Sequence, residues 1–135
     1  MPMADTRLIL VIEDDEPTRE AVLLKLDGAG LASEYATNGA EGLEKLRSGT
    51  AFDAILLDLR MPNVDGFAFL EQKNKDPHIR DIPVVIFSNF SQPEFISRAV
   101  ALGAKGYLVK AQHSIGDIIA EVRSCVTGGI CTIDS

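Results

Sequence analysis

The stretch that decides the fold is Leu8-Ile9-Leu10-Val11-Ile12, which is followed directly by Glu13-Asp14-Asp15. This run is apolar at every position rather than at every second one. Continuous apolarity is typical of a strand buried on both faces, as in a parallel sheet. Ligands of an open parallel sheet bind outside the carboxyl ends of its strands. The acidic residues after this run therefore indicate where a functional site would lie.

Helical patterns alternate with four further apolar runs along the chain, of which residues 32–36 are a weaker run that contains Ser33, Glu34 and Tyr35. Pro17 suits the first turn of a helix and Gly28 its end, and Asn38 with Glu41 three residues later is typical of a helix cap. The alternation predicts an α/β fold: a doubly wound, five-stranded parallel sheet with five helices on two faces, which fits the flavodoxin-like strand order 2-1-3-4-5. The predicted strands lie at residues 8–12, 32–36, 54–57, 84–87 and 107–109, and the predicted helices at residues 17–27, 39–47, 66–75, 93–102 and 115–126.

Composition narrows the classes of function. The length of 135 residues favours one domain, which we expect over residues 7–127, with residues 128–135 as a short C-terminal tail. A net charge of −7 argues against a surface for nucleic-acid phosphate, so no direct nucleic-acid binding is expected. No apolar run is long enough for a membrane span, and no secretory signal is visible. The expected location is the cytoplasm, where a disulfide between Cys125 and Cys131 is not expected.

Polar side chains follow the predicted strands at their carboxyl ends. Asp58 follows the third apolar run, Ser88 the fourth and Lys110 the fifth. Because parallel strands end at the same edge of a sheet, we expect these residues to lie close to Glu13 and Asp14.

The three carboxylates of Glu13, Asp14 and Asp58 would raise one another's pKa and destabilise the fold unless a cation relieves their repulsion. Oxygen ligands without histidine or thiolate favour Mg²⁺, with Mn²⁺ as a second option. Lys110 adds an ammonium and Ser88 a hydroxyl, a set that can support phosphoryl transfer to Asp58. From the residues alone, simpler interpretations stay open: an acidic helix N-terminus, a solvated lysine and a loop serine.

The order and spacing of several short motifs give the chain a resemblance to a known family. From about residue 8 to 127 it resembles the receiver domain of two-component response regulators, in the stand-alone form of chemotaxis regulators. The resemblance implies a signalling switch rather than an enzyme, although one that assists its own phosphorylation and dephosphorylation. The motifs are Val11-Ile12-Glu13-Asp14, Asp58 with Met61-Pro62 and Asp65-Gly66, Ser88, Gly103-Ala104 and Gly106-Tyr107-Leu108-Val109-Lys110.

The resemblance also implies roles for individual residues. Asp58 would accept the phosphoryl group, and Ser88 and Lys110 would contact its oxygens. Tyr107 would be the switch aromatic that turns inward when Ser88 moves toward the phosphoryl group, although a half-buried structural aromatic would look the same in the sequence. Mg²⁺ would be held by Asp14, by Glu13 through water, by Asp58 and by the backbone carbonyl of Arg60.

The implied partners are proteins. The phosphodonor would be a sensor histidine kinase or a phosphotransfer protein. The output would be a change in binding to an unknown downstream protein, through the surface of the fourth helix, fifth strand and fifth helix. The chain would act as a monomer or a weak homodimer.

Three positions depart from the family pattern. Ala111 stands where a proline in a cis bond usually follows the lysine, and a cis bond without proline is unfavourable by about 3 kcal/mol. This predicts a trans or displaced loop at Lys110. Asn89 replaces a small residue after Ser88 and would narrow access to the phosphoryl site. Arg60, two residues after Asp58, would overhang the site.

Two other functions fit parts of the pattern. A pseudo-receiver, which binds partners independently of phosphorylation, is favoured by Ala111 but disfavoured by the complete acidic set with Ser88 and Lys110. A metal-dependent phosphohydrolase that acts through an aspartyl-phosphate usually has an acid/base carboxylate two residues after the nucleophile, where Arg60 stands here. It also needs a cap over the substrate, for which the chain has no room.

Overall fold

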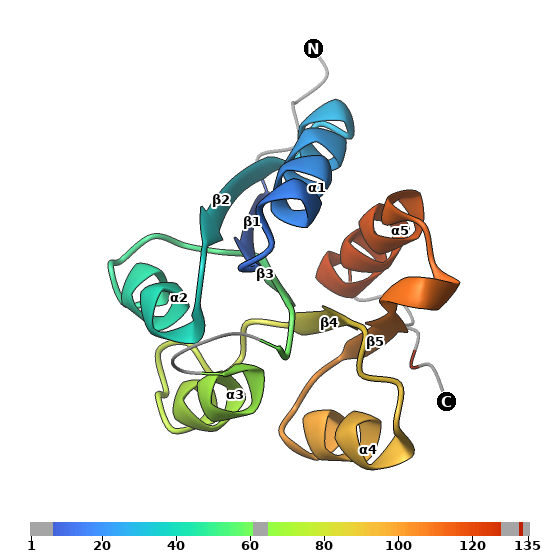
Figure 1. Cartoon of the computed structure of the whole chain (residues 1–135). Helices are drawn as coiled ribbons and strands as arrows, with labels where there is room; N and C mark the ends of the chain where they lie inside the picture. The colour runs from blue at the N-terminus through green and yellow to red at the C-terminus, as the bar shows by residue number, and fades with distance from the viewer. Residues whose placement is uncertain (1–6, 61–64, 128–132, 134–135) are drawn as a thin grey trace.

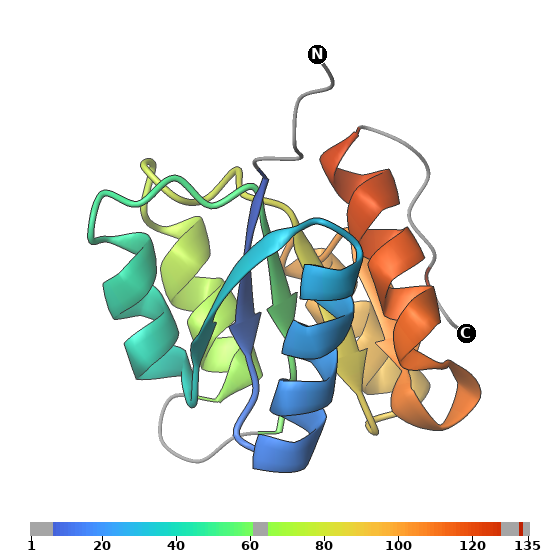
Figure 2. The same cartoon turned by 90° about the horizontal axis from the view of Figure 1, so that it is seen from above.

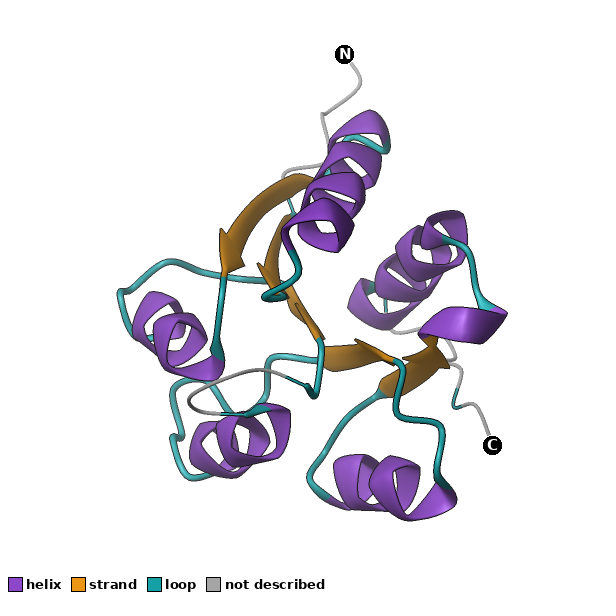
Figure 3. Ribbon diagram, in the orientation of Figure 1, coloured by secondary structure: helices purple, strands orange, loops and turns teal. Residues whose placement is uncertain are grey.

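The computed structural model describes residues 7–60, 65–127 and 133. Its parallel strands form one sheet in the order β2-β1-β3-β4-β5. Helices cover both faces of this sheet (Figures 1 and 2), and strands and helices alternate along the chain (Figure 3). The predicted α/β class and strand order are confirmed.

Every predicted element is present, and its boundaries differ from the predicted ones by one residue at most. Three residues that were predicted to be helical, Arg47, Lys75 and Leu102, are instead the C-caps of their helices. The strands are β1 (Leu8–Ile12), β2 (Ala32–Ala36), β3 (Ala54–Leu57), β4 (Val84–Ser88) and β5 (Gly106–Val109). The helices are α1 (Glu16–Gly28), α2 (Gly39–Leu46), α3 (Gly66–Asn74), α4 (Pro93–Ala101), the short 3₁₀ helix η1 (Lys110–Gln112) and α5 (Ile115–Val126).

Continuous apolarity in the strands arises because alternate side chains enter two different cores. In β1, Leu10 and Ile12 belong to the core beneath α2, α3 and α4. Ile9 and Val11 belong to the core beneath α1 and α5. Figure 1 shows α1 and α5 together on one face of the sheet and the other three long helices on the opposite face. A strand buried on both sides needs an apolar residue at every position, as the sequence shows.

Side chains at the helix N-termini fix where the helices begin. The carboxylate of Asp15 accepts hydrogen bonds from the backbone N–H and the hydroxyl of Thr18, and these bonds lower the pKa of Asp15. Asp15 therefore caps α1, whereas Glu13 and Asp14 lie at the carboxyl edge of the sheet. The predicted cap of α2 is also present, since Asn38 Oδ1 accepts from the N–H of Glu41 at 2.8 Å.

Most of the predicted C-terminal tail, like Met61-Pro62, lies outside the described residues. Ile133 forms an isolated parallel bridge with Tyr107 of β5. Cys125 in α5 is disulfide-bonded, so the expectation of no disulfide is wrong for this residue; Cys131 lies outside the described residues. That expectation considered the redox compartment and not the geometry of the chain. In the described ranges, no helix combines the length and apolarity that crossing a bilayer requires.

Gly66, at the start of α3, packs directly against the loop that carries Asp58. A Cβ atom at Gly66 would lie 2.5 Å from the Cα of Leu59 and 3.1 Å from the carbonyl oxygen of Asp58. The N–H of Gly66 donates to the carbonyl of Leu59 at 3.1 Å. Any side chain here would displace the backbone next to Asp58.

We expect Gly66→Ala to lower the free energy of unfolding by about 1–3 kcal/mol, as overpacking of a tight site does. Gly28→Ala is the matched control. It lies in the last turn of α1, a Cβ there would meet nothing within 4 Å, and alanine should stabilise it by up to about 1 kcal/mol. Urea unfolding of both variants measures the difference, and equal effects would contradict the close approach of α3 to this loop.

Candidate functional site

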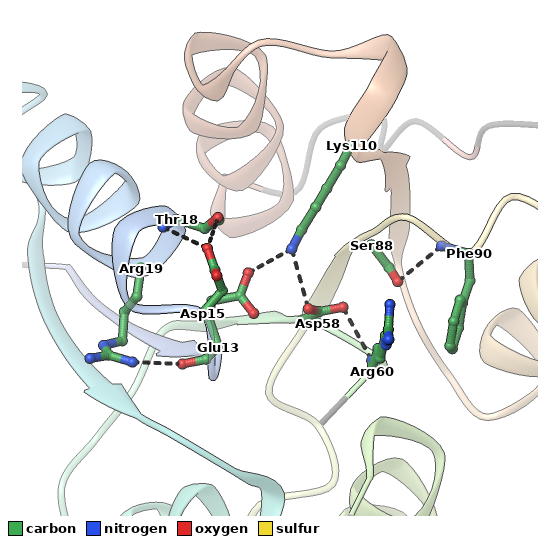
Figure 4. Close-up of polar contacts among 9 residues, drawn as sticks. All are labelled: Glu13, Asp15, Thr18, Arg19, Asp58, Arg60, Ser88, Phe90 and Lys110. Carbon is green, nitrogen blue, oxygen red and sulfur yellow. Dashed lines mark hydrogen bonds and ion pairs between the residues drawn. The ribbon is translucent and has the colours of Figure 1, made fainter. Parts of the chain in front are cut away.

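The structure brings the predicted site residues together at the carboxyl edge of the sheet. Glu13 and Asp14 follow β1, Asp58 follows β3, Ser88 ends β4 and Lys110 follows β5. Figure 4 shows the side chains of Glu13, Asp58 and Lys110 pointing toward one another. One carboxylate oxygen from each of Glu13, Asp14 and Asp58 lies within 4.8 Å of the others. The simple interpretation as an acidic helix N-terminus applies only to Asp15.

Lys110 bridges two of these carboxylates. Its Nζ atom lies 2.7 Å from Oε1 of Glu13 and 3.2 Å from Oδ2 of Asp58, and the three side chains are only 16%, 5% and 9% exposed. Burial lowers the pKa of Lys110, but the hydrogen bond to Glu13 and the charge of Asp58 outweigh this effect, so the pKa is raised. The ammonium therefore stays charged at neutral pH.

The replacement of proline by Ala111 does not prevent this contact. None of the described peptide bonds is cis, so the predicted trans bond is found. The chain forms η1 at this point, and Lys110 still reaches Asp58. With the trans bond, the ammonium lies within hydrogen-bond distance of both carboxylates.

The buried carboxylate of Glu13 is only partly paired. Its side chain is buried, and its Oε2 atom has no hydrogen-bond partner while Oε1 pairs with Lys110. Burial, with Asp58 as a second cause, raises the pKa of Glu13 to about 8. A buried carboxylate oxygen without a partner, beside two other carboxylates, suits a hard divalent cation that binds oxygen. The donor set therefore fits Mg²⁺.

An open, polar cavity of about 510 Å³ gives access to Asp58. Arg60 and Asn89, two of the residues that depart from the family pattern, both line it and are exposed. The backbone N–H of Arg60 also donates to Oδ1 of Asp58 at 3.2 Å. The other lining residues are Asp14, Asp15, Glu16, Thr18 and Lys110.

Ser88 and Tyr107 are connected through Phe90, a residue that the sequence analysis did not single out. The N–H of Phe90 donates to Oγ of Ser88 at 3.2 Å, and the Tyr107 hydroxyl donates to the carbonyl of Phe90 at 2.6 Å. The expectation of half burial for Tyr107 is wrong, because its side chain is fully buried, as a structural aromatic can also be. Both bonds use the backbone of Phe90, which every residue type but proline could supply, so no sequence signal marks it.

Comparison with known proteins agrees with this geometry. A model of the response regulator receiver domain matches residues 9–123. The chain belongs to the receiver-domain family. Receiver domains are signalling domains rather than conventional enzymes, they bind Mg²⁺ at an acidic pocket, and they interact with histidine kinases and phosphotransfer proteins.

Several individual receiver proteins are similar to this chain. It is 34% identical over 127 residues to the gliding motility regulatory protein of Myxococcus xanthus, covering 92% of this chain and 16% of that protein. It is 36% identical over 121 residues to the DNA-binding transcriptional regulator NtrC of Escherichia coli, covering 89% of this chain and 25% of that protein. The chain thus spans a quarter or less of the length of these two relatives.

Solved structures show the same receiver architecture. The chemotaxis response regulator CheY4 of Vibrio cholerae superposes with a TM-score of 0.80 at 27% identity, covering 88% of this chain and 98% of that one. The receiver domain of a signal transduction histidine kinase from Syntrophus aciditrophicus superposes with a TM-score of 0.82 at 28% identity, covering 91% and 92%.

Replacing Glu13 with glutamine tests the fit of this receiver's acidic pocket to a divalent cation. For the native chain, Mg²⁺ at 100 times its dissociation constant should add about 2.7 kcal/mol to the free energy of unfolding. Glu13→Gln should lose most of this gain. Its metal-free stability at neutral pH should match or exceed the native value, because folding of the native chain must either bury the Glu13 charge or protonate a carboxyl group whose pKa rises to about 8. Thermal unfolding with and without Mg²⁺ measures both quantities, with Glu20→Gln on the exposed side of α1 as the control; an undiminished Mg²⁺ response would contradict the assignment.

Proposed function

We propose that this receiver domain is a phosphorylation-controlled switch in which Asp58 accepts the phosphoryl group. The observation that carries the proposal is the environment of Asp58, which opens to a polar cavity and lies 3.2 Å from the Lys110 ammonium. Beside it is a buried Glu13 oxygen that has no partner. The proposed donor is a phosphohistidine of a sensor histidine kinase or a phosphotransfer protein.

The proposed transfer breaks the phosphorus–nitrogen bond of the donor and forms a phosphorus–oxygen bond to Asp58. Lys110 would pair with one phosphoryl oxygen and the Ser88 hydroxyl would donate to another, which would stabilise the charge that develops on them. By the same contacts the domain would assist its own phosphorylation and its later hydrolysis.

The proposed cofactor is Mg²⁺, with Mn²⁺ as a substitute. It would be held by the side chains of Glu13, Asp14 and Asp58 and by the backbone carbonyl of Arg60. When bound, the ion supplies positive charge that offsets the negative charge of the phosphoryl oxygens. Arg60 and Asn89 flank the cavity and would control which donors and how much water reach Asp58.

The proposed output follows from the Ser88–Phe90–Tyr107 contacts. A phosphoryl group adds a charge of about −2 and would accept a hydrogen bond from the Ser88 hydroxyl, drawing it toward Asp58 and away from the N–H of Phe90 that donates to it in the structure. The segment after β4 would move, and with it the surface formed by α4, β5 and α5, changing its affinity for a downstream protein. The side chain of Tyr107 is fully buried without a phosphoryl group.

We propose a domain over residues 7–127 that acts in the cytoplasm as a monomer or weak homodimer, without direct contact to nucleic acid. The pseudo-receiver alternative was favoured by Ala111. The contacts of Lys110 with Glu13 and Asp58 weigh against it, because they retain the cation that phosphoryl transfer requires.

Intact mass after incubation with acetyl phosphate tests the phosphoacceptor. We expect a gain of one phosphoryl group that requires Mg²⁺ and is absent from Asp58→Asn. Because rapid hydrolysis would also give no adduct, the same samples are titrated with beryllofluoride, which mimics the phosphoryl group without being hydrolysed. Absence of both the adduct and beryllofluoride binding would overturn the proposal in favour of a pseudo-receiver.

Tyr107→Phe tests the connection to the segment after β4. Losing the 2.6 Å hydrogen bond to the Phe90 carbonyl should lower the free energy of unfolding by about 1 kcal/mol. It should speed amide exchange around Phe90 while leaving the yield of phosphorylated Asp58 unchanged, since Tyr107 touches no reacting atom. Tyr35→Phe, which removes a hydroxyl from an exposed tyrosine, should stay within about 0.5 kcal/mol of the native value.

A further inference from the structure

Arg19 contacts the acidic loop from a position outside the predicted site. It lies one turn into α1, and its Nη1 atom donates to the backbone carbonyl of Glu13 at 3.1 Å (Figure 4). The bond spans six residues and closes the loop between β1 and α1. Arg19 lies in none of the motifs that mark the site in the sequence.

The carbonyl that Arg19 holds belongs to the peptide unit joining Glu13 to Asp14. A peptide unit is planar, so fixing its carbonyl also fixes the direction in which Asp14 leaves the strand. On the other side, the N–H of Glu13 donates to the carbonyl of Ala36, at the end of β2, at 3.0 Å. The backbone of Glu13 is thus fixed at both of its polar groups, and Arg19 supplies the only one of these two contacts that comes from a side chain.

Tyr35 of β2 holds the guanidinium of Arg19 in place. The Arg19 Cζ atom lies 4.7 Å from the centre of the Tyr35 ring, within the range of a cation–π contact. Tyr35 is 43% exposed, so packing in the core does not account for an aromatic residue at this position. Lys45 also lies over the ring, with Nζ at 5.4 Å from its centre, and it pairs with Glu34 at 3.8 Å.

We propose that Arg19, backed by Tyr35, is a positioning residue that presents Glu13 and Asp14 to the divalent cation. This inference rests on the Mg²⁺ site of the proposed function. As a positioning residue, Arg19 would strengthen Mg²⁺ binding, whereas its positive charge alone would weaken it. A cation near three carboxylates should weaken the binding of a second cation, whereas a residue that orders the ligands should strengthen it.

Titration calorimetry with Mg²⁺ on the full chain separates the two effects. Arg19→Met removes both the charge and the hydrogen bond, and we expect Mg²⁺ to bind about tenfold more weakly, at the low end for loss of a residue that orients metal ligands. If Arg19 acted through charge alone, the same variant would bind Mg²⁺ more tightly. Arg19→Lys keeps the charge and one donor, so it should recover part of the affinity.

Variants at Tyr35 and Lys45 test the proposal without altering Arg19. Tyr35→Leu leaves every charge in place and should weaken Mg²⁺ binding by about threefold, the effect of a lost cation–π contact at an exposed site. Tyr35→Phe keeps the ring and should bind as the native chain does. Lys45→Met removes a cation from the same ring without touching the loop, and its affinity should be unchanged or slightly higher.

Each outcome has a distinct meaning. Native affinity in Arg19→Met, or tighter binding, overturns the positioning role while leaving the Mg²⁺ site intact. Absence of Mg²⁺ binding by the native chain overturns the proposed site itself. Should Arg19→Met fail to fold, Arg19→Lys and Tyr35→Leu decide the question, and native affinity in both overturns the proposal. Melting of each variant without metal shows whether a change in affinity follows a general loss of stability.

Discussion

Repulsion between buried carboxylates is the constraint on which the rest of this structure depends. Glu13 and Asp58 lie at the end of a sheet that is packed on both faces, where water screens their charges poorly. Lys110 contacts both, at 2.7 and 3.2 Å, and offsets part of their charge. One oxygen of Glu13 keeps no partner, so the neutralisation is incomplete. The two cores of the fold provide the stability that holds these groups together.

The same constraint explains why the loops around the site are held by backbone contacts. The carbonyl of Glu13 accepts from Arg19, the N–H of Arg60 donates to Asp58, and Gly66 lies directly against the backbone beside Asp58. Groups that repel one another would move apart if their loops were free. Contacts to the main chain hold these loops, and Asp14 and Asp58 line the cavity beside them.

Phe90 links this charged site to the apolar surface of α3 and α4. Its backbone joins Ser88 and Tyr107, and its ring stacks on Phe95 with the ring centres 4.8 Å apart. Phe95 in turn lies 6.0 Å from Phe67 of α3, whose ring has Arg98 above it. A shift of the Ser88 hydroxyl therefore has a continuous path of contacts to two helices. The path runs through stacked aromatic rings.

Two of the three departures from the family pattern lie along the cavity that leads to Asp58, and none removes a contact among Glu13, Asp58 and Lys110. Ala111 in place of proline leaves Lys110 within reach of Glu13 and Asp58. Arg60 and Asn89, by contrast, line the cavity where a donor would approach. The contacts among Glu13, Asp58 and Lys110 are thus present without the proline, and the other two departures lie along the cavity that leads to Asp58.

The sequence by itself determined the elements, the strand order that fits them, and the residues at the carboxyl edge. Strands buried on two faces are apolar at every position, and the polar site residues follow directly where those strands end, so both features can be read from the order of residues. It did not determine which oxygen of Glu13 lacks a partner, that Phe90 joins Ser88 to Tyr107, or that Arg19 holds the Glu13 carbonyl. Those contacts run through backbone groups and join segments far apart in the chain or fold back across a loop. Only the tertiary structure decided them, because such contacts depend on where the loops come to rest and leave no periodic signal in the sequence.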